Sequence, residues 1–120
     1  MHRTLIGLAT LTAAAAITAV PASATTAGTT LTGTVGPEDT IALTNGAGHN
    51  VSTLKAGSYT IVIQDKANDH NFHLTGPGVN RTTSVGGTGR TVWHITLKRG
   101  TYRFVCDPHA SFMKGSLTVR

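Results

Sequence analysis

The stretch from Val105 to Leu117, VCDPHASFMKGSL, holds the only cysteine of the chain, together with a histidine and a methionine. Cys106, His109 and Met113 lie close enough in sequence for one loop to turn a thiol, an imidazole and a thioether towards a single point. Two imidazoles, one thiolate and a weak axial methionine form a copper site for electron transfer, whereas structural zinc needs four strong cysteine or histidine donors. The stretch therefore predicts a copper site that needs one more histidine from elsewhere in the chain.

The first residues predict export. The chain has 120 residues, enough for one domain with one core. It begins with the positive segment MHRT, continues with a weakly apolar run and reaches Ala22-Ser23-Ala24, the small-residue pattern of signal-peptide cleavage. We therefore expect residues 1–24 to be a signal peptide and residues 25–120 to be an exported domain. Its location would be extracellular, periplasmic or at the cell surface, without stable membrane insertion after cleavage.

The charge pattern does not predict a nucleic-acid interface. The chain has ten Lys and Arg residues against five Asp and Glu residues, but the basic residues are scattered and not interleaved with aromatic ones. Export has a consequence for the lone cysteine, because a free thiol is readily oxidised in an oxidising compartment. A bound metal would occupy that thiol.

Short apolar runs separated by Gly, Pro and Asn predict an all-β domain from Thr25 onwards. About seven to eight strands of this length favour a β-sandwich. The pattern L-K-x-G-[ST]-Y occurs at residues 54–59 and again at 97–102, and we interpret both copies as similar corners that lead into a core strand. The predicted strands cover residues 30–35, 40–43, 58–64, 70–75, 90–97, 101–106 and 116–119.

Alternation along the predicted strands places the two sulfur atoms at the end of the core. Cys106 has the same parity as Phe104, which is apolar and is expected to face inward. Met113 has the same parity as Leu117 and Val119 after the loop. Both sulfur-bearing residues are therefore expected inside the domain.

The same alternation favours His70 as the missing ligand. In the predicted strand 70–75, Phe72 belongs to the core face, so His70 faces inward while Asn71 and His73 face outward. The other histidines are interpreted as surface residues, although parity gives no information for the one in the glycine-rich loop. The alternative candidates for the ligand are His73 and His49, and His94 is expected to face outward.

An enzyme is a weaker interpretation of the same residues. Cys106 and His109 could form a nucleophile and its base, but the sequence supplies neither an orienting third group nor an evident oxyanion site. This interpretation would also leave Met113 unexplained. We therefore do not expect catalysis.

The segments DHNFHLTGPG and GTYRFVCDPHASFMKGSLTV resemble the cupredoxin, or blue-copper, family of plastocyanin and azurin type. The resemblance implies a Greek-key β-sandwich that holds one copper ion and cycles it between Cu(I) and Cu(II). It implies the ligands His70, Cys106, His109 and Met113, and it gives Asn71 the role of tying the early ligand to the cysteine loop. The spacing between His109 and Met113 departs from that of well-known members.

The expected function is transfer of one electron between a protein donor and a protein acceptor, by a monomer. The alternative is a copper scavenger or delivery protein with the same ligands. Pro108, Ala110, Phe112 and the turn 76–78 are expected to form a small apolar patch around the edge of His109. The scattered basic charges would then favour an acidic partner.

Overall fold

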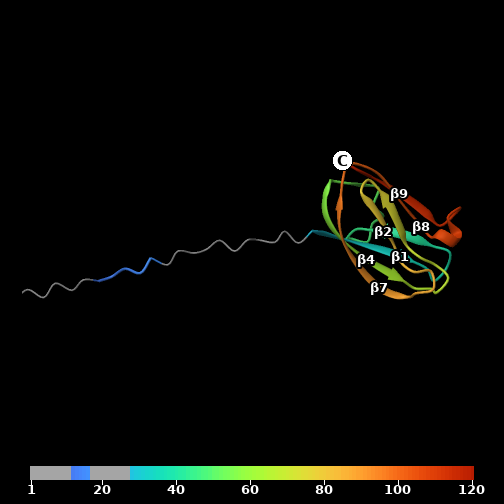
Figure 1. Ribbon diagram of the computed structural model, residues 1–120, viewed down its shortest axis with the longest axis horizontal. Helices are drawn as coiled ribbons and strands as arrows, with labels where there is room; N and C mark the ends of the chain where they lie inside the picture. The colour runs from blue at the N-terminus through green and yellow to red at the C-terminus, as the bar shows by residue number, and fades with distance from the viewer. Residues whose placement is uncertain (1–11, 17–27) are drawn as a thin grey trace, which may run out of the picture.

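The structure is a computed structural model that describes residues 12–16 and 28–120 (Figure 1). Most of the predicted signal peptide, residues 1–24, and the first residues of the predicted domain lie outside the described residues, so that boundary stays a prediction. No helix in the described ranges is long and apolar enough to cross a membrane.

The described residues form two β-sheets and one short 3-10 turn. The strand order is β2-β1-β4-β7 in one sheet and β3-β9-β8-β5-β6 in the other. Neighbouring strands are antiparallel except β1 with β4 and β3 with β9. The elements are β1 (Thr29–Val35), β2 (Ile41–Thr44), β3 (Thr53–Leu54), β4 (Gly57–Asp65), β5 (His73–Gly76), β6 (Val79–Thr82), β7 (Gly89–Leu97), β8 (Gly100–Val105), η1 (Asp107–His109) and β9 (Lys114–Val119).

The core lies between the two sheets because alternate residues of most strands are apolar and buried. Phe72, which precedes β5, joins the two layers. Its ring stacks on Phe104 of β8 with ring centroids 5.5 Å apart, and it meets Trp93 of β7 edge-on at 6.2 Å. Phe72 directly follows His70 and Asn71 in the sequence, so the cluster gives the loop that carries them a fixed support.

The predicted β-sandwich is confirmed, and the described residues contain nine strands where about seven to eight were expected. The sequence pattern did not indicate β3 and β6, because β3 has only two residues and β6 is mostly exposed.

The predicted strand 70–75 was wrong at its start. β5 begins only at His73, and the three residues before it are all buried: His70 is 1% exposed, Asn71 2% and Phe72 0%. The expectation that Asn71 faces outward was therefore wrong, because alternation does not apply to a loop. His70 is buried as predicted, although not for the predicted reason.

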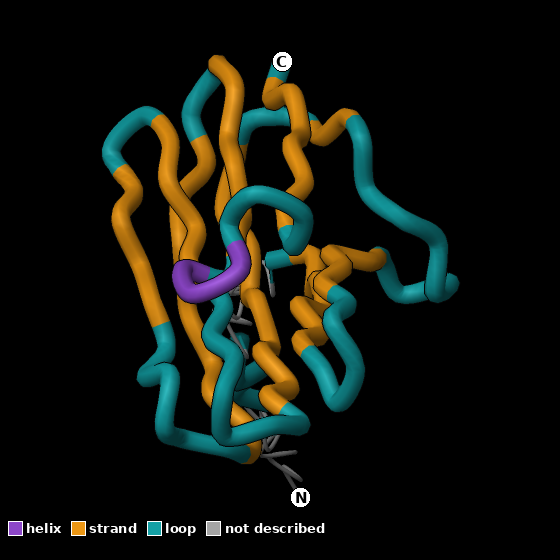
Figure 2. The backbone as a smooth tube through the Cα atoms, turned by 90° about the vertical axis from the view of Figure 1, so that its right-hand side faces the viewer, coloured by secondary structure: helices purple, strands orange, loops and turns teal. Residues whose placement is uncertain are grey.

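Four loops meet at one end of the sandwich, which Figure 2 shows from outside with η1 in front. β1 and β4 run parallel and finish together at Val35 and Asp65, and the end of β8 pairs with the start of β5. β6 ends beside the start of β5, and β7 begins beside the end of β4. The loops β1–β2, β4–β5, β6–β7 and β8–β9 therefore converge there. The turn 76–78 lies at the opposite end, so its predicted place beside the metal was wrong: β5 runs away from this end before it turns into β6.

Candidate metal centre

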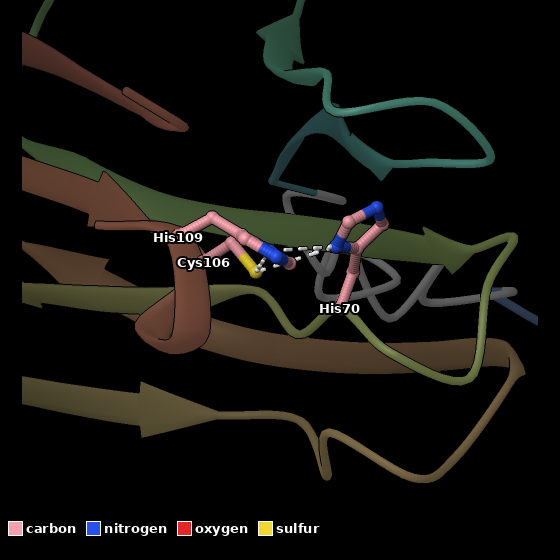
Figure 3. Close-up of side chains that lie close together, drawn as sticks. All are labelled: His70, Cys106 and His109. Atoms are coloured by element: carbon pink, nitrogen blue, oxygen red, sulfur yellow. Dashed lines mark hydrogen bonds between the residues drawn. The ribbon is translucent and has the colours of Figure 1, made fainter. Parts of the chain in front are cut away.

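Three donor atoms converge inside the end of the sandwich that carries η1 (Figure 3). His70 Nδ1 lies 3.1 Å from His109 Nδ1, and Cys106 Sγ lies 3.7 Å from the first nitrogen and 3.6 Å from the second. His70 and Cys106 are buried, whereas His109 is half-buried. The structure thus brings together three of the four predicted ligands.

The loop between β8 and β9 is closed by its own backbone, which fixes Cys106 and His109 relative to each other. His109 N–H donates to the carbonyl of Cys106 at 3.0 Å, and Met113 N–H donates to the carbonyl of His109 at 2.8 Å. Cys106 N–H donates to the carbonyl of Met113 at 3.0 Å. Met113 is therefore held next to Cys106 through the backbone, and its side chain is only 1% exposed.

Asn71 ties His70 to this loop with two hydrogen bonds. Its Oδ1 accepts from the backbone N–H of Asp107 at 2.7 Å, and its Nδ2 donates to the Asp107 carboxylate at 2.7 Å. Asn71 is a direct neighbour of His70, and Asp107 is a direct neighbour of Cys106. The buried amide therefore couples the two segments that carry the donor atoms, as the resemblance implies.

The donor set fits copper. Both imidazoles turn the same nitrogen towards the cysteine sulfur, and the three atoms all lie within 4.8 Å of one another. A thiolate with two imidazoles is a soft to borderline set, which suits copper. Among the described residues this cluster contains three His, Cys, Asp or Glu side chains, one fewer than the four strong donors of a closed structural zinc site.

The outer edge of His70 faces negative charge. Its Nε2 lies 3.6 Å from a carboxylate oxygen of Asp39 and 3.8 Å from one of Asp69. These two carboxylates are exposed, so water screens them. Asp65 is different because it is 7% exposed and burial raises the pKa of its carboxyl group.

His73, an alternative ligand candidate, points away from the three donors and pairs with Asp107 instead. Its Nδ1 lies 2.9 Å from Asp107 Oδ1, and its Nε2 lies 2.7 Å from Asn80 Oδ1. The hydrogen bonds to Asp107 and Asn80 raise the pKa of His73. Partial burial opposes the ionisation of Asp107, but hydrogen bonds from His73 and Asn71 hold its pKa below the ordinary value.

The other two histidines in the part of the chain that the structure describes do not join the cluster. His49, the other alternative candidate for the missing ligand, is exposed in the loop after β2 and lies outside the cluster. His94 is exposed on β7, as alternation predicted. Sequence reasoning missed the carboxylates of Asp39 and Asp69, because loop residues far from the ligand motif give no periodic signal.

The comparisons agree with this geometry. Residues 17–120 match the family described as copper binding proteins of the plastocyanin/azurin family. Reduced rusticyanin is similar in structure, with 17% sequence identity, a TM-score of 0.57, and 76% of this chain and 78% of that chain covered. An amicyanin variant in its Cu(I) form has 16% identity and a TM-score of 0.51, with 76% and 82% covered. No curated protein matches the sequence.

The family match and the cluster of His70, Cys106 and His109 together indicate a site for one copper ion. The low identities mean that the similar structures support the fold alone.

Proposed function

We propose that this chain, which belongs to the copper-binding plastocyanin/azurin family, is an exported blue-copper protein that carries one electron between protein redox partners. The observation that carries the proposal is the convergence of Cys106 Sγ with the Nδ1 atoms of His70 and His109. Bound copper would supply the one-electron chemistry, and no substrate would be chemically changed.

His70, Cys106 and His109 would hold the ion, and Met113 would supply a weak fourth donor. The chain's own contribution is a rigid arrangement of donors. One ligand lies on the β4–β5 connection and the others lie on the β8–β9 loop, and Asn71 connects the two segments. A donor set held in this way allows little movement between the two oxidation states.

Electrons would enter at His109, the ligand whose side chain is half-buried rather than buried. Phe112 lies beside it, with ring centroids 5.5 Å apart, and is 58% exposed. Pro108 and Ala110 are exposed in the same loop. Such a small apolar surface favours the brief, weak encounters of redox proteins.

The test is a titration of the purified domain with Cu(II), followed by visible absorption and by metal analysis. We expect one copper per chain and the intense colour of a thiolate–copper bond. Cys106→Ser should abolish that colour, because a hydroxyl group does not replace a thiolate. His94→Ala is the matched control and should keep it. Colour that survives in Cys106→Ser would refute a blue-copper site.

The copper-loaded protein also distinguishes electron transfer from the alternative function, copper delivery. An electron carrier should retain its copper through repeated reduction and oxidation, whereas a delivery protein should transfer copper readily to an acceptor. Export is tested separately by the mass of the secreted protein, which should correspond to cleavage after Ala24.

A further inference from the structure

His73 bridges the copper-binding loop and the β5–β6 hairpin. Its ring nitrogens face two oxygen atoms on different segments: Nδ1 faces Asp107 at 2.9 Å, and Nε2 faces Asn80 at 2.7 Å. His73 begins β5, Asn80 belongs to β6, and Asp107 directly follows Cys106. The histidine is thus placed to hold the loop that carries the thiol against the β5–β6 hairpin.

The backbone bonds within the β8–β9 loop cannot do this by themselves. They connect Cys106, His109, Phe112 and Met113 only with one another. Other segments hold the loop at Asp107. Asn71 accepts from its backbone N–H and donates to one carboxylate oxygen, both at 2.7 Å, and His73 faces both carboxylate oxygens, at 2.9 and 3.1 Å.

We propose that His73 is a positioning residue that holds Asp107, and with it Cys106, in place through the contact of Nδ1 with the Asp107 carboxylate. The consequence of this contact for copper retention rests on the proposed function. The contact between His73 and Asp107 belongs to the chain itself and positions the loop with or without the metal.

This contact differs from an isolated surface ion pair, which contributes little to stability. Asp107 also binds Asn71, which is 2% exposed, so the carboxylate belongs to a network with a buried member. An imidazole that donates from both nitrogens is charged, and the raised pKa of His73 agrees with this form. Charge-assisted hydrogen bonds of this kind are the stronger ones.

The test uses the metal-free full domain and the alkylation of Cys106 by iodoacetamide. Cys106 is the only cysteine and is 0% exposed, so alkylation requires the loop to open. His73→Leu removes both contacts and should accelerate alkylation about fivefold, the effect of losing one hydrogen bond of ordinary net strength, because the half-exposed Asp107 carboxylate is screened by water. His94→Leu, the matched control on β7, should leave the rate unchanged.

Two amide variants separate the two contacts. His73→Asn places a donor near the position of Nδ1, so it should restore slow alkylation to within about twofold of the natural protein. His73→Gln places its amide near the position of Nε2 and should behave like His73→Leu. Rescue by Asn but not by Gln is a signature that a general loss of packing would not produce.

The copper-loaded protein provides a second measurement, the rate of copper release to a chelator, which should follow the same order among the variants. Alkylation of His73→Leu at the natural rate would overturn the proposal, and so would rescue by Gln without rescue by Asn. Should His73→Leu fail to fold, the comparison of Asn with Gln decides. A protein that binds no copper would refute the proposed function, while the alkylation rates would still decide the role of His73.

Discussion

The two ends of the sandwich are built from the same kind of strand-to-loop connections (Figure 1), but the acidic residues gather at only one of them. Every acidic residue of the chain lies in the loops or strand ends at the copper end: Glu38, Asp39, Asp65, Asp69 and Asp107. Four basic residues lie near them: Lys66, Arg81, Arg90 and Lys114. The opposite end carries four basic residues and no acidic one: Lys55, Lys98, Arg99 and Arg120.

The ends also differ in how they use polar groups. At the opposite end, each copy of the repeated pattern places a tyrosine hydroxyl on the backbone of its own corner. Tyr59 donates to the carbonyl of Lys55 at 2.6 Å, and Tyr102 accepts from the N–H of Lys98 and donates to the carbonyl of Pro77, both at 2.9 Å. These corners hold strands in place.

The copper end keeps buried polar groups that do not stabilise the fold in this simple way. His70 and Asn71 are buried and serve the donor cluster, and one carboxylate oxygen of Asp65 is buried without a hydrogen-bond partner. Unpaired buried polar groups cost stability. The comparison therefore indicates that one end supports the fold and that the other carries the chemistry.

The division of roles between the two ends predicts its largest effect, a change in reduction potential, for Met113→Leu at the copper end. Leucine has a similar volume, so the buried position should tolerate the change and copper should remain bound. Losing a weak donor disfavours Cu(II) more than Cu(I), so the reduction potential should rise, by about 59 mV for each tenfold change in relative binding. Voltammetry measures the shift.

The outcome also tests the role of the thioether. Loss of copper from Met113→Leu would identify Met113 as a strong ligand, and an unchanged potential would place its sulfur out of reach of the metal. The spacing after His109 departs from that of well-known family members, and Met113 is the predicted ligand that the cluster of His70, Cys106 and His109 does not contain.

The ligand assignment shows how much the sequence alone predicts. Cys106 and His109 could be found because they lie in one short motif, and the fold could be inferred from alternation and turn residues. His70 was selected by alternation although it lies in a loop, where its burial comes from the packing of neighbouring Phe72. Alternation does not account for this burial, because the neighbouring Asn71 is buried too and β5 begins only at His73.

The contacts of the loops could not be predicted in the same way. His73 and Asp107 are 34 residues apart in sequence and meet only because β5 and β8 pair side by side. The separation of charge depends on the topology too. The expectation of an acidic partner treated the basic residues as scattered, whereas the fold gathers all five acidic residues at the copper end. The charge of the partner therefore stays a prediction.

A smaller effect is expected at the opposite end from Tyr102→Phe. The side chain is 0% exposed and its hydroxyl group makes two hydrogen bonds, to Lys98 and Pro77. Removing it should lower the free energy of unfolding by about 1–2 kcal/mol, measured by denaturant titration. The visible spectrum and the reduction potential should not change. A shifted potential would show that the two ends are coupled, against the division of roles described above.

The smallest effect concerns the approach of redox partners and is measured with small metal complexes of opposite charge. Phe112→Glu adds a negative charge beside His109, where the exposed ring leaves room for the new side chain. The spectrum should stay intact. Electron exchange with anionic hexacyanoferrate should slow about threefold at low ionic strength, and exchange with cationic hexaammineruthenium should not slow.

Val92→Glu is the matched control, because Val92 is also an exposed apolar residue but lies within β7, away from the donor cluster. It introduces the same charge and should change neither rate by more than a small factor. The acidic copper end further predicts that exchange of the natural protein with the cationic complex slows as salt is added, since salt screens the attraction. If the two glutamate variants slow hexacyanoferrate equally, electrons do not enter beside His109, and the apolar surface around Phe112 has another role.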